Sequence, residues 1–212
     1  MRDQIAYRGI PLIIILFLSV SLLASEIHVE DAADSIPAFE NLIFDDPSFQ
    51  QSFRKQFQQA LVYFPELGDI HIRIRCSDIA TSMNSRPHIR AFVSRRKNRE
   101  YLITVDTLDE NRTGLFFRLS DSARIGLIGH ELAHILDYHH HHLAGVAREG
   151  LEYLLHRARL EHRTDRIAIK HGLRNYLRRY AEASFDPAFA GIRYARFKKK
   201  YYYSSNELAS IE

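Results

Sequence analysis

The sequence predicts an α+β fold in which a short β-sheet or hairpin packs on a bundle of helices. Residues 70–75 alternate isoleucine with polar side chains, which is the period of a half-buried strand. Residues 46–64 and 122–138 repeat apolar side chains every three or four positions, which is the spacing of amphipathic helices. The 212 residues, 46% of them hydrophobic, are enough for one domain with a substantial core.

The first 25 residues have the order of an export signal. Arg2 and Arg8 precede the apolar run 10–24, and small residues follow near its end. The run is short against the ~20 residues that span a bilayer comfortably. We therefore expect residues 1–25 to be a signal peptide or, as the alternative, an N-terminal anchor. An exported protein, periplasmic or secreted, is the corresponding expectation.

Residues 26–44 are expected to form a mature N-terminal lead, and residues 45–212 the folded domain. The first predicted helix begins after Asp46, a suitable cap, with Pro47 in its first position. The helix ends before Pro65. Its phenylalanines recur at helical spacing and are expected to lie in the core.

The β-rich part of the chain follows this helix. Residues 90–94 and 100–106 flank a basic turn and predict a hairpin. Cys76, the only cysteine, excludes an internal disulfide and is expected to pack at a strand end.

Helices are expected over most of the remaining chain. Ser120 or Asp121 caps a helix through residues 122–138. Further helices are predicted at 144–160, around 161–172 with Gly172 as a natural stop, and at 173–183.

The predicted helix 122–138 carries the pattern H-E-x-x-H. His130 and His134 are four residues apart, so both imidazoles lie on one face and can reach a single ion. Glu131 projects about 100° away, where it can meet a metal-bound water as general base of a zinc hydrolase. Burial of these side chains without a metal or partner would be costly. We predict one bound Zn²⁺.

Two residues compete to be the third ligand. His140 fits the metzincin pattern H-E-x-x-H-x-x-G-x-x-H, but Asp137 occupies the glycine position and no methionine follows the helix. Glu161 and Asp165 share one face of a second predicted helix. A carboxylate from that helix completes a His₂Glu site, and a nearby aspartate can hold a free ring nitrogen of a ligating histidine. The residues favour Glu161.

The motifs LIGHELAHILD and EHRTDRIAIKHG together resemble the gluzincin metallopeptidases of the HtpX and CAAX-prenyl-endopeptidase group, in particular their soluble exported bacterial members. The resemblance covers residues 120–175. It implies a small gluzincin-type metallopeptidase domain that hydrolyses peptide bonds in a protein or peptide substrate. It also implies the roles of five residues: zinc ligation by His130, His134 and Glu161, catalytic base for Glu131, and support for Asp165.

The resemblance implies that a substrate lies extended beside a strand edge. Residues 100–106 are the candidate strand, with a buried core strand as the alternative. A different function also stays open, in which a non-hydrolytic envelope chaperone or assembly factor retains the fold and the zinc. Glu131 argues for catalysis, because a metal does not need that residue.

Two further stretches suggest binding. His139–His142 can supply a fourth ligand to a purely structural zinc, or form a polar, exposed helix end. Residues 193–203 interleave cations with aromatic side chains, which is typical of weak association with an anionic membrane surface. An amphipathic helix whose lysines extend to solvent is the alternative. We expect no nucleic-acid partner for an exported protein of net charge +3.

Overall fold

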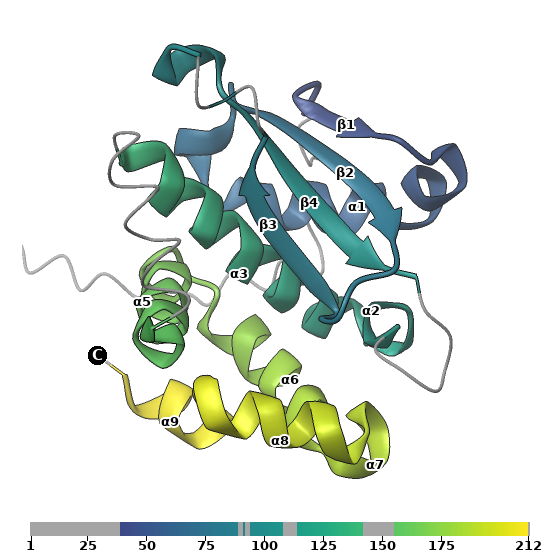
Figure 1. Cartoon of the computed structure of the whole chain (residues 1–212), viewed down its shortest axis with the longest axis vertical. Helices are drawn as coiled ribbons and strands as arrows, with labels where there is room; N and C mark the ends of the chain where they lie inside the picture. The colour runs from purple at the N-terminus through teal and green to yellow at the C-terminus, as the bar shows by residue number, and fades with distance from the viewer. Residues whose placement is uncertain (1–38, 89–90, 92–93, 108–113, 142–154, 212) are drawn as a thin grey trace, which may run out of the picture. The chain divides into compact units, whose positions relative to one another are not determined.

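The computed structural model in Figure 1 describes residues 39–88, 91, 94–107, 114–141 and 155–211. The predicted signal segment 1–25 and most of the predicted lead 26–44 lie outside these ranges. The fold is mixed α and β, as the sequence predicts.

The sheet has the strand order β1-β2-β4-β3. These strands are β1 (Leu42–Phe44), β2 (His71–Ser77), β3 (Met83–Pro87) and β4 (Glu100–Asp106). The pairs β1–β2 and β2–β4 are parallel, and β3 is antiparallel to β4. Ile72 and Ile74 of β2 are buried, in line with the predicted alternation. Strand β1 comes from the last residues of the predicted lead, so the folded part begins before residue 45.

The hairpin forms with a different first arm from the predicted one. Its strands are β3 and β4, whereas Ala91 and Ser94, the described residues of the predicted arm, lie in no strand. Strand β3 reads MNSRP, and Met83 is its only buried residue, so it lacks the alternation that marks a strand. Pro87 at its end is tolerated because β3 is an edge strand.

Strand β4 is an interior strand, with β2 on one side and β3 on the other. Both of its edges are therefore paired, and residues 100–106 cannot receive a substrate strand. That prediction is wrong, and the alternative of a buried core strand is confirmed, since Tyr101 to Asp106 are all buried.

The main helices lie close to their predicted positions. They are α1 (Pro47–Val62), α3 (Asp121–His140), α5 (Arg157–Lys170) and α6 (Arg174–Phe185). As an exception, residues 157–160, expected in the preceding helix, belong to α5. The Asp46 carboxylate accepts hydrogen bonds from the first turn of α1, and the Ser120 hydroxyl caps α3. Gly172, with a φ of +91°, follows the end of α5. Most of the predicted helix 144–160 lies outside the described residues.

The shorter elements are α2 (Leu115–Arg118), α7 (Pro187–Ala190), α8 (Ile192–Tyr201), α9 (Ser205–Ser210) and two 3₁₀ turns, η2 (Pro65–Leu67) and η4 (Arg96–Asn98). Helix α3 packs against α1 and β3 on one side and against α5 and α6 on the other (Figure 1). The H-E-x-x-H helix therefore runs through the core.

Helices α3 and α6 approach each other closely at Gly126. A Cβ atom added there would lie 2.2 Å from the carbonyl oxygen of Tyr176 in α6. This backbone-to-backbone contact requires a glycine and holds α6 against the helix that carries the motif.

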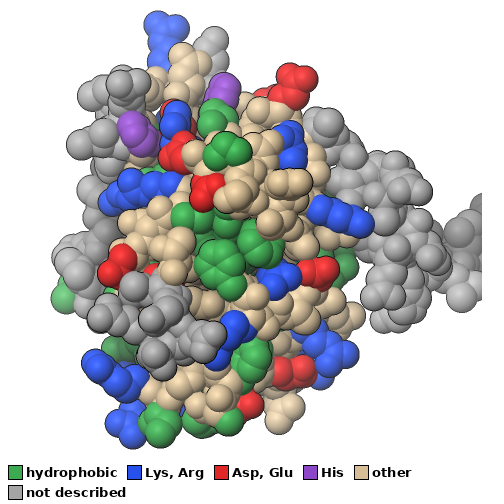
Figure 2. Space-filling model, turned by 90° about the vertical axis from the view of Figure 1, so that its right-hand side faces the viewer, with side chains coloured by type: hydrophobic (Ala, Val, Ile, Leu, Met, Phe, Trp, Pro, Cys, Tyr) green, Lys and Arg blue, Asp and Glu red, His purple; other side chains and the backbone are tan. Residues whose placement is uncertain are grey.

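Figure 2 shows one face of the molecule, on which basic and acidic side chains are interspersed around a group of apolar ones. Within the described ranges, none of the helices is both long enough and apolar enough to cross a membrane.

Candidate metal centre

Three polar side chains of the motif lie in the buried part of α3. His130, Glu131 and His134 are 3%, 5% and 8% exposed, in a stretch whose apolar neighbours are also buried. An isolated buried carboxylate or imidazole is costly unless it is paired or binds a metal. The motif therefore needs partners from other elements.

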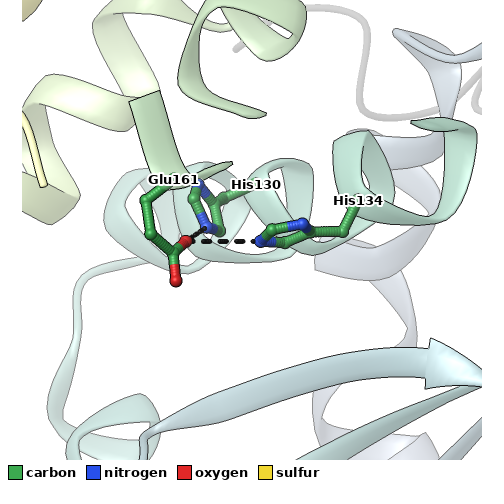
Figure 3. Close-up of side chains that lie close together, drawn as sticks. All are labelled: His130, His134 and Glu161. Carbon is green, nitrogen blue, oxygen red and sulfur yellow. Dashed lines mark hydrogen bonds and ion pairs between the residues drawn. The ribbon is translucent and has the colours of Figure 1, made fainter. Parts of the chain in front are cut away.

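Helix α5 supplies one of these partners. Nε2 of His130 lies 3.2 Å from Oε2 of Glu161, and Nε2 of His134 lies 3.4 Å from the same oxygen. Figure 3 shows the two rings and the carboxylate pointing toward one another. One ligand atom of each residue lies within 4.8 Å of the other two, so this buried group could hold a metal ion.

Hydrogen bonds on the far side of each ring fix its tautomer. Nδ1 of His130 lies 2.8 Å from Oδ1 of Asp165, a carboxylate that can only accept, so this nitrogen carries the hydrogen. Nδ1 of His134 lies 3.1 Å from the Thr164 hydroxyl, which donates to the Leu160 carbonyl and so accepts from the ring. Both Nε2 atoms are left facing Glu161, where each could present a lone pair to a metal ion. Metal-ligating histidines are held in this way.

Thr164 was not recognised in the sequence. It stands beside Asp165 and three residues after Glu161, so all three side chains reach the same side of α5. Threonine in a helix usually bonds its own backbone, as Thr164 also does, which is why its spacing alone gave no signal.

The electrostatics favour a positive charge between the three ligand atoms. Burial lowers the pKa of His130, but the hydrogen bonds with Asp165 and Glu161 outweigh it and raise the pKa to about 10. Burial raises the pKa of Glu161, but the hydrogen bonds with His130 and His134 hold it well below its usual range. A proton or a metal ion can supply the missing charge, and two imidazole nitrogens with one carboxylate oxygen are a donor set that suits zinc.

Arg157 binds the other oxygen of the Glu161 carboxylate. Its Nε lies 3.4 Å from Oε1, and its guanidinium stacks on the ring of Phe197 in α8. Oε2 is thereby left to face the histidines. The carboxylate is held from both sides before any ion binds.

Glu131 lies next to His130 in the chain but outside the group of ligand atoms. It lies near a buried ring of hydroxyls formed by Ser82, Tyr180 and Tyr194. The three hydroxyl oxygens lie 2.6–3.2 Å from one another. Burial raises the pKa of both tyrosines, and the Glu131 charge adds to this effect. The hydroxyls tie the start of β3 to α6 and α8 beside the proposed base.

The histidine run contributes no ligand in the part that the structure describes. The ligand group there consists of His130, His134 and Glu161, and it includes none of His139 to His141. Nδ1 of His139 lies 3.3 Å from the Tyr101 hydroxyl, and the His141 carbonyl accepts from Arg99. His142 lies outside the described residues. The choice of Glu161 over His140 thus agrees with the geometry.

Helix α8 departs from the alternative in which its lysines extend to solvent. Lys199 and Lys200 are exposed, but Lys198 is only 3% exposed. That alternative is wrong for Lys198, because the side chain turns inward against tyrosine rings. Membrane association of residues 193–203 stays a prediction.

No family model matches the chain, and comparison with curated proteins and with solved structures finds no match. What the fold and the site define is an α+β chain with a buried His₂Glu group. Any function must be argued from that group.

Proposed function

We propose that this protein is a zinc-dependent endopeptidase of the small gluzincin type. The observation that supports this is the meeting of His130, His134 and Glu161 at one buried point, from two helices whose ligands are far apart in sequence. Their tautomers and hydrogen bonds suit a divalent cation, and Glu131 provides a carboxylate that the metal does not require.

Zinc bound by these three residues would supply a Lewis acid that lowers the pKa of a water molecule toward ~7. In that arrangement Glu131 would take the proton of a water that attacks a peptide carbonyl and would deliver it to the leaving amine. Asp165 and Thr164 hold the two imidazole rings in the required tautomer. Arg157 holds the carboxylate of Glu161.

Strand β3 is the proposed platform for an extended peptide. Among the described strands it pairs only with β4, so its outer edge faces away from the sheet. It also packs against α3, which carries the ligands and the base. An extended peptide can add to such an edge through main-chain hydrogen bonds.

A non-hydrolytic zinc protein of the cell envelope, such as a chaperone or assembly factor, is the alternative. It would use the same three ligands. The two proposals differ in what they require of Glu131, which only turnover needs.

The test measures bound zinc and hydrolysis of casein or a peptide by wild type, Glu131→Gln and Glu161→Ala. Glu131→Gln is expected to keep zinc while turnover falls about 10²–10⁴-fold, the range for loss of a general base. Glu161→Ala is expected to lose zinc, because one ligand is removed. Glu182→Gln, at an exposed residue paired with Arg179, is the control and should match wild type.

Equal hydrolysis by wild type and Glu131→Gln would refute the peptidase proposal. Zinc retention without any turnover by wild type would favour the non-hydrolytic alternative. Unchanged zinc content in Glu161→Ala would refute the ligand set.

A further inference from the structure

Helix α8 buries a lysine beside the candidate metal centre. Nζ of Lys198 lies 3.0 Å from the centre of the Tyr202 ring and 4.7 Å from the centre of the Tyr180 ring. Lysine is almost never fully buried unless it is paired. The aromatic faces offset part of the cost of removing its charge from water, and the rest needs another explanation.

The acidic groups of the centre do not provide that explanation. Lys198 forms no hydrogen bond or ion pair with any of the residues that the structure describes. Asp165 is bonded to His130, and Glu161 is bonded to the histidines and to Arg157. The ammonium group is therefore not the direct counter-ion of either carboxylate.

The amine nevertheless lies within electrostatic range of the centre. Burial lowers the pKa of Lys198 to about 8, while Glu161, Asp165 and Glu131 act in the opposite direction. Lys198 lines the same small pocket as His130, Asp165 and Tyr202, with room for about one water molecule. The Tyr202 ring, on which the ammonium stacks, has its centre 5.7 Å from that of His130. The charge thus sits on the α8 side of the centre, one aromatic ring from a predicted ligand.

We propose that Lys198 is the second electrophilic group of the site and stabilises the negative charge that develops on the carbonyl oxygen of the scissile peptide bond. This inference rests on the proposed endopeptidase function. A fixed charge in a water-poor site acts more strongly on a developing oxyanion than the same charge in water. Lys198 stays protonated and forms no bond to the substrate, and the proton of the attacking water still moves through Glu131 to the leaving amine.

The pattern of burial along α8 supports a specific role for this position. Lys199 and Lys200, its immediate neighbours, are exposed, so a basic sequence alone does not draw a lysine inward. Methionine has a similar length and would fill the same apolar surroundings without the cost of a buried charge. Replacing a buried charge with an apolar side chain of similar volume is often neutral or stabilising. The buried charge is therefore better explained by a role in the reaction than by a contribution to the stability of the fold.

The test uses the full chain loaded with zinc and compares wild type, Lys198→Met and the matched control Lys199→Met. We expect kcat of Lys198→Met to fall about 10²–10³-fold, the range for loss of one oxyanion-stabilising group, with little change in KM. Zinc retention in equilibrium dialysis should equal or exceed that of wild type, because removing a nearby positive charge cannot weaken a cation site by repulsion. Lys199→Met should match wild type in all three quantities.

A second measurement reports on binding instead of turnover. A phosphinic peptide, which carries a tetrahedral anion, should bind Lys198→Met at least tenfold more weakly than wild type. If only peptides with a free C-terminal carboxylate lose turnover and amidated ones do not, Lys198 anchors the substrate terminus, and the inference is overturned.

Other outcomes are equally decisive. If Lys198→Met has the kcat of wild type while Glu131→Gln is inactive, this inference is overturned and the proposed endopeptidase function stands. Loss of zinc in Lys198→Met also overturns it, because the lysine would then be structural. If Lys198→Met does not fold, Lys198→Gln, which removes the charge and keeps a polar tip, is judged by the same criteria. Both proposals are overturned if wild type shows no turnover and Lys198→Met binds the phosphinic peptide as tightly as wild type does.

Discussion

The two sides of the candidate metal centre are built differently. On the α5 side, Glu161, Thr164 and Asp165 each have a direct hydrogen-bonding partner on α3. On the α8 side, Lys198 and Tyr202 contribute a charge and a ring, and the lysine has no ion pair within the described residues. The satisfied side is suited to hold an ion. The other side holds a charge that no described carboxylate pairs with directly, and we propose that this charge acts on a ligand.

This difference explains why a site can be stable and reactive at once. Paired groups rigidify a buried polar network, whereas an unpaired buried charge costs stability and is retained where it acts. Changes on the α5 side should therefore alter the affinity for zinc, and a change at Lys198 should alter stability and turnover.

The largest expected effect is the cost of the buried lysine in the metal-free protein. Burial lowers the pKa of Lys198 to about 8 in the folded state, against its ordinary value of 10.5. Between these values the unfolded state binds more protons, so the free energy of unfolding rises with pH there. Wild type should gain about 3 kcal/mol relative to Lys198→Met between pH 8 and 10.5, at 1.36 kcal/mol per pH unit.

Urea unfolding of both metal-free proteins at several pH values measures this difference directly. Lys199→Met provides the control, because its exposed amine should leave the pH dependence of wild type unchanged. Parallel curves for wild type and Lys198→Met would show that Lys198 carries no buried charge, and the contrast between the two sides of the centre would fail.

The next effect concerns the carboxylate behind His130. Asp165→Asn keeps an acceptor for the ring N–H but removes the charge, so the imidazole becomes a weaker ligand. We expect zinc affinity to fall about 10–100-fold, measured by competition with a chromophoric chelator. Any turnover by the zinc-loaded protein should change less than its affinity for zinc.

Asp137→Asn is the matched control for this change. Asp137 lies on α3, forms ion pairs with Arg163 and His141, and is not part of the ligand group. An equal loss of zinc affinity in both variants would mean that Asp165 acts through general stability. An unchanged affinity in Asp165→Asn would remove α5 from its proposed role behind the ring.

Local patterns in the sequence identified the elements whose burial is periodic. The Asp46 cap, the alternating isoleucines of β2 and the helix through His130 were all predicted from spacing. Strand β3 was not, because an edge strand with one buried side chain has no period to detect. Strand β4 was recognised, but its interior position depends on the pairing of β2 and β3, which no local pattern specifies.

The same distinction applies to the site. The spacing of His130, His134, Glu161 and Asp165 follows from helix geometry, and the structure brings all four together. Lys198 could not be recognised, because a lysine in a basic run normally points to solvent. Its burial results from the packing of α8 against α6, with Tyr180 and Tyr202 providing the surface that covers it.

The smallest expected effect separates the two histidines. Thr164→Val keeps the shape of the side chain but leaves the Nδ1 hydrogen of His134 without its acceptor. Loss of one neutral hydrogen bond costs about 1 kcal/mol, which corresponds to about fivefold weaker zinc binding. The same competition assay measures this change, and Thr164→Ser, which retains the hydroxyl, should lose less zinc affinity.

The comparison with Asp165→Asn tests whether a charged acceptor holds His130 more strongly than a hydroxyl holds His134. A loss of zinc affinity in Thr164→Val as large as that in Asp165→Asn would contradict this view. An equal effect of the serine and valine variants would show that packing, and not the hydroxyl, orients the ring.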